Sequence, residues 1–309
     1  VDGITAVSNG SQVMHMLTAI LVGLAMGVTV SISHAVGAEN HTLVERTIGN
    51  TITLFACISI VSTFLLLIFV KPLVVLLNVP QEAMTGTVQY LVICFMGIPF
   101  ITAYNIISSI YRGLGDSKSP MYIIAIACLL NIILDYIFIG LCHMGPIGAA
   151  LGTTVSQSVS VIMALISMKY RTSDIHIKKE DLRLQSQVFK HILKVGFPVA
   201  IQDGCVQIAF MIITIIANSR GLNDAAAVGI VEKMITAIFI IPSTMLATVS
   251  ALSAQNIGAK DYGRARTVLK YAVMITTLYG IIVALIVECA APTLLGLFTK
   301  DTTVILLGV

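Results

Sequence analysis

The sequence is poor in charge: 11% of its 309 residues are Asp, Glu, Lys or Arg, while 57% are hydrophobic and the mean hydropathy is +0.97. Four stretches contain none of these charged residues: 3–38, 47–70, 83–111 and 136–168. Each is longer than the roughly 20 residues that a helix needs to cross a bilayer. This scarcity of charge argues against an ordinary soluble domain and predicts a membrane protein with several spanning helices.

Common catalytic and metal-binding motifs are also missing. There is no GxxxxGK phosphate loop, no HExxH and no GxSxG, so the chain lacks the usual machinery for ATP-driven transport or hydrolysis and is not expected to be an enzyme. The six cysteines lie in or beside apolar segments without CxxC or Cys/His ligand spacing. We interpret them as small hydrophobic residues. We therefore expect no metal site and no cofactor, and the absence of a nucleotide site favours an ion-driven mechanism.

What the sequence does contain is an internal repeat. Residues 6–38 align without gaps on residues 227–259, at a constant offset of 221. Each copy runs from an apolar stretch into a short polar segment, VTVSISHAVGAEN in the first and VSALSAQNIGAKD in the second, and then enters another apolar stretch. Duplicated membrane halves are typical of secondary transporters, whose substrates bind between the repeats. Because residues 196–221 precede only the second copy, we expect the chain to be truncated at both ends.

The apolar stretches predict an all-α polytopic membrane protein with eight complete spans and the start of a ninth. The predicted spans cover 12–36, 50–71, 87–111, 119–141, 146–169, 193–218, 226–254 and 268–297, and residues 302–309 open the next one. Lipid permits only helices or closed barrels to cross, and these stretches are too long and too uniformly apolar for barrel strands.

Basic residues concentrate in alternate loops. The loops near residue 46 and over 112–118, 169–194 and 260–270 carry fourteen Lys and Arg residues, whereas the opposite loops carry three. By the positive-inside rule, the first set faces the cytoplasm of a plasma membrane or cell inner membrane. The basic segment 170–194 is interpreted as a cytoplasmic linker near an anionic leaflet, and no nucleic-acid partner is expected.

Several motifs together resemble the multidrug and toxic compound extrusion (MATE) family. They are YRGLGDSKSPMY (111–122), NIILDYIFIG (131–140), GPIGAALGTTVSQ (145–157), VGFPVAIQ (195–202) and AQNIGAK (254–260), and their order covers essentially the whole chain. The resemblance implies twelve helices in two six-helix bundles related by pseudo-two-fold symmetry, with helices two to nine and the edge of ten present here. It also implies an antiporter that exports cationic or amphiphilic compounds in exchange for Na+ or H+.

On this plan the chain divides into an N-terminal lobe over 1–169, a cytoplasmic inter-lobe linker over 170–192 and a C-terminal lobe over 193–309. We expect the protein to act as a monomer surrounded by membrane lipid. Within the predicted helices, Gly23 and Gly27 form a GxxxG spacing that favours close helix packing. Gly97 and Pro99 predict a bend in the span over 87–111.

Asp135 is the leading candidate for binding the coupling ion or proton. It lies in an otherwise uncharged helix, where a carboxylate costs roughly 2.5–3.5 kcal/mol at the bilayer centre, and Asn131 lies one turn earlier on the same face. The alternative is a structural polar pair that locks two helices together. The resemblance adds Thr153 and Asn105 to this site as members of an N-lobe polar network, together with an Asp on a first helix that the chain lacks.

The C-terminal lobe offers four candidates for ion or substrate contact: Asp203, Gln202, Gln207 and Glu232. Asp203 follows Gly196 and Pro198, which can loosen the backbone near the start of the helix and free carbonyl groups to line a cavity. The alternative for Asp203 is exposure near the cytoplasmic interface. For Glu232 the alternatives are lining a pathway and snorkelling to the interface.

Other functions remain open from the sequence. A flippase for lipid-linked sugars, from the wider superfamily with the same two-lobe plan, would need a strongly cationic cavity for pyrophosphate, and Lys and Arg are nearly absent from the apolar stretches. A non-transporting membrane receptor or assembly protein would not need carboxylates inside the membrane.

Overall fold

The computed structural model describes residues 2–77, 79, 81–171, 178–183 and 185–309, and among these residues the secondary structure is helical, with no strand. The elements are α1 (Asp2–Gly37), α2 (His41–Leu76), α3 (Gln81–Met96), α4 (Ile98–Gly113), α5 (Lys118–Asp135), the π-helical segment η1 (Tyr136–Leu141), α6 (Gly145–Arg171), α7 (Ser186–Arg220), α8 (Leu222–Gly258), α9 (Tyr262–Gly296) and α10 (Thr302–Gly308). Seven spans are long and apolar enough to cross a membrane, and α3 with α4 makes an eighth if this bent pair is one span. The predicted polytopic all-α fold is confirmed.

Helices α3 and α4 are bent against each other by 46° at Gly97, as Gly97 and Pro99 predict. Pro99 lies at the start of α4, where its missing N–H costs little. The bend also brings Gly97 against α6, because a Cβ on Gly97 would lie 2.9 Å from Oγ1 of Thr154.

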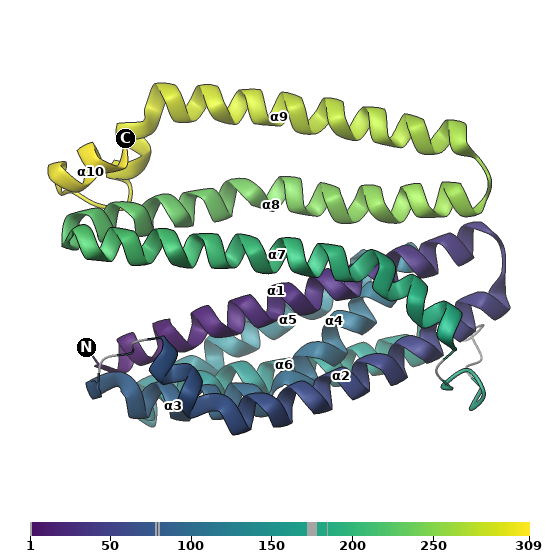
Figure 1. Ribbon diagram of the computed structural model, residues 1–309, viewed down its shortest axis with the longest axis horizontal. Coiled ribbons are helices and arrows are strands. Elements are labelled where there is room, and N and C mark those ends of the chain that lie inside the picture. The colour runs from purple at the N-terminus through teal and green to yellow at the C-terminus, as the bar shows by residue number, and fades with distance from the viewer. Residues whose placement is uncertain (1, 78, 80, 172–177, 184) are drawn as a thin grey trace.

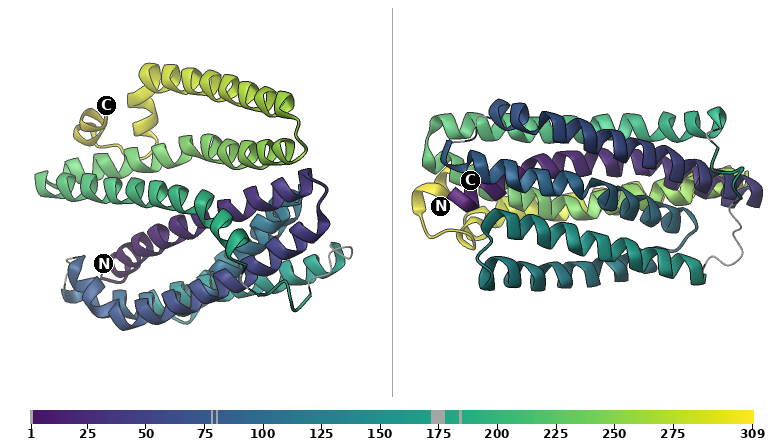
Figure 2. Two further views of the ribbon diagram at one scale, coloured as in Figure 1. Left: turned by 45° about the vertical axis from the view of Figure 1, so that its right-hand side comes forward. Right: turned by 90° about the horizontal axis from the view of Figure 1, so that it is seen from below.

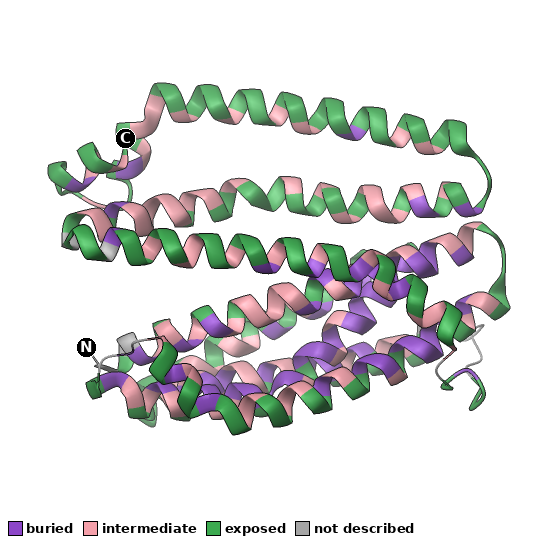
Figure 3. Ribbon diagram, viewed as in Figure 1, coloured by how far each residue is buried: buried purple, intermediate pink, exposed green. Residues whose placement is uncertain are grey.

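Helices α1 to α6 form one bundle, and α7, α8 and α9 run beside it (Figures 1 and 2). Most of the buried residues belong to the first bundle (Figure 3). Its three apolar clusters fill the space between α1 and α2 to α6, and Ile192 of α7 joins one of them. The N-terminal lobe thus holds the densest core of the described residues.

The repeat maps onto matching helices. Gly37 ends α1 and Gly258, 221 positions later, ends α8. His41 begins α2 and Tyr262, again 221 positions later, begins α9. The two copies therefore fold into the same helix–turn–helix unit.

The two copies also meet each other reciprocally. A Cβ on Gly37 would overlap the carbonyl oxygen of Gln255, and a Cβ on Gly258 would overlap the carbonyl oxygen of His34. Since His34 and Gln255 are themselves equivalent positions of the repeat, each copy presents the same surface to the other. Such a contact is typical of a two-fold axis, which here passes between the ends of α1 and α8.

Close packing between the two lobes continues along α1 and α7. A Cβ on Gly23 would lie 2.6 Å from the Cα of Ala200, and a Cβ on Gly27 would lie 2.9 Å from the amide nitrogen of Gly196. Small residues let helix backbones approach in this way. We call the contacts of Gly23, Gly27 and Gly37 with α7 and α8 the inter-lobe seam. From it, α1 and α7 diverge toward the end that carries both termini (Figure 1).

The predicted linker over 170–192 contains the ends of two helices. Helix α6 continues to Arg171, and α7 begins at Ser186, so residues 186–192 are helical. Ile192 has no exposed surface and packs in the cluster that contains Val28, and the partly buried Val188 and Phe189 pack against the same cluster. Three apolar side chains therefore anchor the start of α7 to the N-terminal lobe.

The described part of the linker is fixed to the N-terminal lobe by the side chains of α2. Asn50, which is 1% exposed, donates to the carbonyl of Asp181 over 3.2 Å and accepts from the N–H of Gln185 over 2.6 Å. Thr53 Oγ1 donates to the carbonyl of Leu182 over 2.7 Å. The first residue of α7 therefore directly follows a residue that is hydrogen-bonded to α2.

Candidate functional site

Asp135 and Asn131 face α6 together. Both project from α5 onto Gly152: a Cβ on Gly152 would overlap Oδ1 of Asp135 and would lie 3.5 Å from Nδ2 of Asn131. The two side chains share one face of α5, as their spacing predicts. Only the absence of a side chain on Gly152 leaves room for them between the two helices.

Two atoms of this pair are buried without a hydrogen-bond partner among the described residues: Oδ1 of Asp135 and Nδ2 of Asn131. Buried polar atoms nearly always have a partner, and a carboxylate in a low-dielectric environment is especially costly without one. A proton or a sodium ion on Asp135 would lower this cost. The carboxylate thus has the chemistry to take up either ion, while no cluster of three or more His, Cys, Asp and Glu side chains occurs in the described part of the chain.

The helix changes its winding directly after Asp135. The π-helical segment η1 starts at Tyr136, whose N–H bonds to the carbonyls of both Ile132 and Ile133. Single π turns inside helices are rare and frequently mark functional sites. Hydropathy gives no signal for this feature.

Thr153 and Asn105 lie on α6 and α4 beside the site, but their side-chain hydrogen bonds are local. Thr153 Oγ1 donates to the carbonyl of Ala149 over 3.1 Å, and Asn105 Nδ2 donates to the carbonyl of Ile101 over 2.8 Å. Each keeps an oxygen with free acceptor capacity. Both residues therefore remain candidates for the network around Asp135.

Sequence reasoning did not include Tyr90 of α3, which is 6% exposed. Its hydroxyl lies 3.2 Å from Oγ of Ser11 on α1. A tyrosine in an apolar helix resembles ordinary packing material, so the sequence alone does not distinguish it. Tyr90 and Ser11 therefore form a polar contact between α3 and α1 in the N-terminal lobe.

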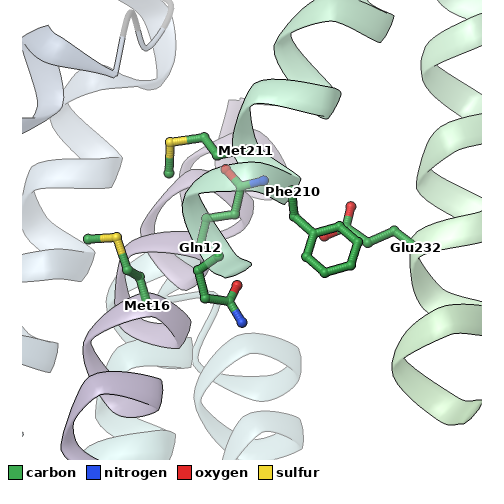
Figure 4. A pocket seen from close by; sticks show the side chains of 6 residues that line it. Gln12, Met16, Phe210, Met211 and Glu232 are labelled. Atoms are coloured by element: carbon green, nitrogen blue, oxygen red, sulfur yellow. The ribbon is translucent and has the colours of Figure 1, made fainter. Parts of the chain in front are cut away.

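A second candidate site lies between the lobes. A small recess, part of it open to the surroundings, is lined by Gln12, Met16, Gln207, Phe210, Met211 and Glu232. Gln12 and Met16 belong to α1, the next three residues to α7 and Glu232 to α8. Figure 4 shows Glu232 extending from α8 toward α7. We call this space the inter-lobe recess.

The lining of the inter-lobe recess suits an amphiphilic cation. Glu232 supplies one carboxylate, and none of the six lining residues is basic. Phe210 offers an aromatic face for a cation, and the two methionines offer adaptable apolar surface. The glutamine amides can donate to or accept from polar groups of a ligand.

The structure brings only some of the predicted C-lobe residues together. Gln207 and Glu232 both line the recess. Asp203 is half-buried, one turn before Gln207 on the same face of α7 and nearer the seam. Gln202 is exposed and does not line the recess. The sequence pattern did not single out the other four lining residues, Gln12, Met16, Phe210 and Met211.

A further hollow of about 280 Å³ lies between α1, α2 and the start of α7 and is lined by Ser31, His34, Leu43, Thr47, Gln187, Val188 and His191. The imidazole rings of His34 and His191 lie there with centroids 6.4 Å apart and planes tilted by 55°. This pair joins the two lobes at the seam.

The cysteines are free throughout, as the sequence indicated, and five of the six are exposed. The exception is Cys94 of α3, which belongs to the apolar core of the N-terminal lobe.

Comparison with known proteins places this fold in a family. The MatE family model matches residues 1–137 and 198–309. The probable multidrug resistance protein YoeA of Bacillus subtilis is 24% identical over 308 residues, which cover 97% of this chain and 66% of the relative. YpnP of the same organism, with the same description, is 34% identical over 185 residues, 59% of this chain and 41% of the relative.

A solved structure described as the outward-facing conformation of a multidrug resistance MATE family transporter superposes with a TM-score of 0.87 at 22% identity, covering 98% of this chain and 68% of that one. The chain thus spans about two thirds or less of the length of these proteins. The family model covers most of the chain in two stretches, as expected for a duplicated protein. The chain belongs to the multidrug and toxic compound extrusion (MATE) family.

Proposed function

We propose that the protein is a secondary active antiporter that exports cationic or amphiphilic drugs or toxins in exchange for Na+ or H+. The observation that carries this proposal is the separation of two acidic sites. Asp135 lies inside the N-terminal lobe against α6, whereas Glu232 lies in the recess between the lobes. One site can hold the driving ion while the other holds the substrate, an arrangement that is compatible with antiport.

The arrangement of the lobes supports an alternating-access mechanism. The lobes touch along the inter-lobe seam, and the recess lies on the diverging side of it (Figures 1 and 4). Ion binding at Asp135 drives transport only if the ion prefers one arrangement of the lobes to the other. The names of the relatives, multidrug resistance and multidrug export proteins, agree with export of foreign compounds.

The proposed orientation places the seam at the cytoplasmic side of a plasma membrane or cell inner membrane. The α1–α2 turn, the α8–α9 turn and the described linker residues lie at one end of the molecule (Figure 1), and these segments belong to the loops that are rich in Lys and Arg. The recess then opens away from the cytoplasm. The protein acts as a monomer in contact with lipid, without a catalytic step or a resident cofactor.

A lipid-linked sugar flippase is the second candidate from the sequence, but the recess argues against it. A pyrophosphate needs basic partners, and the lining residues include one carboxylate and no Lys or Arg. A receptor without transport activity would leave the buried polar pair at Asp135 and Asn131 unexplained.

The test uses the protein expressed from its complete reading frame, in cells and in proteoliposomes. Asp135→Asn keeps the size of the side chain and removes the ionisable group, so it should leave expression nearly intact and abolish ion-driven export of a cationic dye. Glu232→Gln should weaken export of the dye but spare a neutral amphiphile. The exposed Glu288 provides a matched control, since Glu288→Gln removes an intramembrane carboxylate outside the recess. Export at the native rate by Asp135→Asn under the same gradient would refute the ion step.

A further inference from the structure

Helices α5 and α6 approach each other over two glycines that lie one turn apart. At Gly148, a Cβ would lie 3.1 Å from the Cβ of Phe138 in η1 and 3.1 Å from the Cβ of Met144. At Gly152, a Cβ would overlap the carboxylate of Asp135. The first glycine makes room for apolar packing and the second makes room for a charged group.

The contact at Gly152 constrains how Asp135 can be held. Gly152 is buried, and the carboxylate oxygen Oδ1 occupies the volume in which any side chain at 152 would begin. Side chains occupy discrete rotamers, so a methyl group there would force Asp135 into another rotamer or push α5 away from α6. Asn131 Nδ2 borders the same space and, like Oδ1 of Asp135, has no partner among the described residues.

We propose that Gly152 is a positioning residue for the ion step: its missing side chain holds the Asp135 carboxylate and the Asn131 amide together against the backbone of α6. The inference rests on the proposed role of Asp135 as the ion-binding group. It assigns the ion a place between α5 and α6 rather than on the exposed side of α5, where Ile132 and Ile133 lie.

The experiment measures export in proteoliposomes by the protein from its complete reading frame, with the Na+ concentration and the pH varied separately. Gly152→Ala should raise the concentration of the driving ion needed for half-maximal export roughly threefold to tenfold, the range expected when a side chain is forced off its preferred rotamer. The dye concentration for half-maximal export should stay unchanged, because the inter-lobe recess is built from other helices.

Two alanine variants serve as matched controls. Gly148→Ala crowds the same helix pair one turn away, so it should lower the melting temperature without changing the ion concentration for half-maximal export. Gly280→Ala adds a methyl group to open space, so it should neither lower the melting temperature nor change the ion concentration for half-maximal export. An equal shift of the ion dependence by Gly148→Ala would mean that helix separation alone is responsible, and would overturn the positioning role.

A double variant separates positioning from general packing. Asp135→Ala removes the carboxylate and leaves space for the new methyl group, so Gly152→Ala should lower the melting temperature in the native background and not in the Asp135→Ala background. Loss of stability in both backgrounds would contradict the proposal. If Asp135→Asn still exports dye, the proposed ion step itself fails. If Asp135→Asn abolishes export while Gly152→Ala leaves the ion dependence unchanged, only the role of Gly152 fails.

Discussion

The two copies of the repeat end in the same turn, built from the same bonds. After α1 and after α8, a non-glycine residue adopts a positive φ, 53° at Glu39 and 61° at Lys260. The next residue, Asn40 or Asp261, caps the following helix by accepting from the N–H three residues later, over 3.0 and 2.9 Å. The turn is therefore a property of the local sequence, which both copies share.

Burial, in contrast, differs between the copies. Helix α1 contributes apolar side chains along its whole length to the core of the described residues, from Ala6 to Ala35, whereas α8 contributes Ala227 and Ala254. Helix α1 packs against α2, α3, α4, α7 and α8, while α8 packs chiefly against α1, α7, α9 and α10. Within the described residues, which span about two thirds of the length of the related proteins, the two equivalent helices thus share a backbone and differ in their neighbours.

The largest expected effect is an all-or-none difference in the labelling of cysteines from the two sides of the membrane. In a background without native cysteines, a cysteine at position 39, 178 or 260 should react with an impermeant reagent from the cytoplasmic side only, and a cysteine at position 300 from the opposite side only. Labelling of intact cells and of inverted vesicles distinguishes the two. Reaction of positions 39 and 260 from opposite sides would break the equivalence of the two turns. Reaction of positions 178 and 300 from the same side would contradict the proposed orientation.

A smaller effect tests whether the contacts of Gly37 and Gly258 at the seam are equivalent. Gly37→Ala and Gly258→Ala each place a methyl group on a backbone carbonyl of the other copy, so each should lower the free energy of unfolding by about 1–3 kcal/mol. Because the two contacts are related by the pseudo-two-fold axis, the two losses should be similar. Once one methyl group has opened the seam the second should cost less, so the double variant should lose less than the sum.

Thermal unfolding in detergent micelles measures these losses. Gly280→Ala again supplies the control, since it fills open space in α9 and should stabilise that helix by about 0.5–1 kcal/mol. A loss at Gly37 with none at Gly258 would show that the contact between the copies is not reciprocal.

The smallest effect concerns the two helix caps. Asn40→Ala and Asp261→Ala each remove an N-cap acceptor, so each should cost about 1 kcal/mol of stability. The exchanges Asn40→Asp and Asp261→Asn keep an acceptor and should be nearly neutral. Equal melting temperatures for Asn40→Ala and the native protein would contradict the prediction that both N-caps stabilise the fold.

Much of the fold could be predicted because its signals are local. Long stretches without charge predict the spans, the constant offset predicts the matched helices, and Gly97 with Pro99 predicts the bend between α3 and α4. The start of α7 could not be predicted, since residues 186–192 mix polar and apolar side chains, and the apolar ones are covered by residues far away in the chain.

The candidate sites likewise combine residues that the sequence predicts with contacts that it does not. Asp135 and Asn131 stand out in the sequence because a carboxylate in an apolar helix is costly and their spacing places them on one face. Gln207 and Glu232 are visible as polar residues, but their meeting in one recess with Gln12 depends on how three helices are rotated about their axes.

The sequence by itself determined the membrane class, the duplicated helix–turn–helix unit and the polar residues available for transport, because hydropathy, repetition and caps act over short distances. The tertiary structure decided which of these residues face each other. Gly152 contacts the carboxylate of Asp135, and Gly37 contacts the carbonyl oxygen of Gln255, only because their helices pack at particular rotations. Contacts of this kind depend on the rotation and depth of each helix, and a pattern within one helix does not fix either.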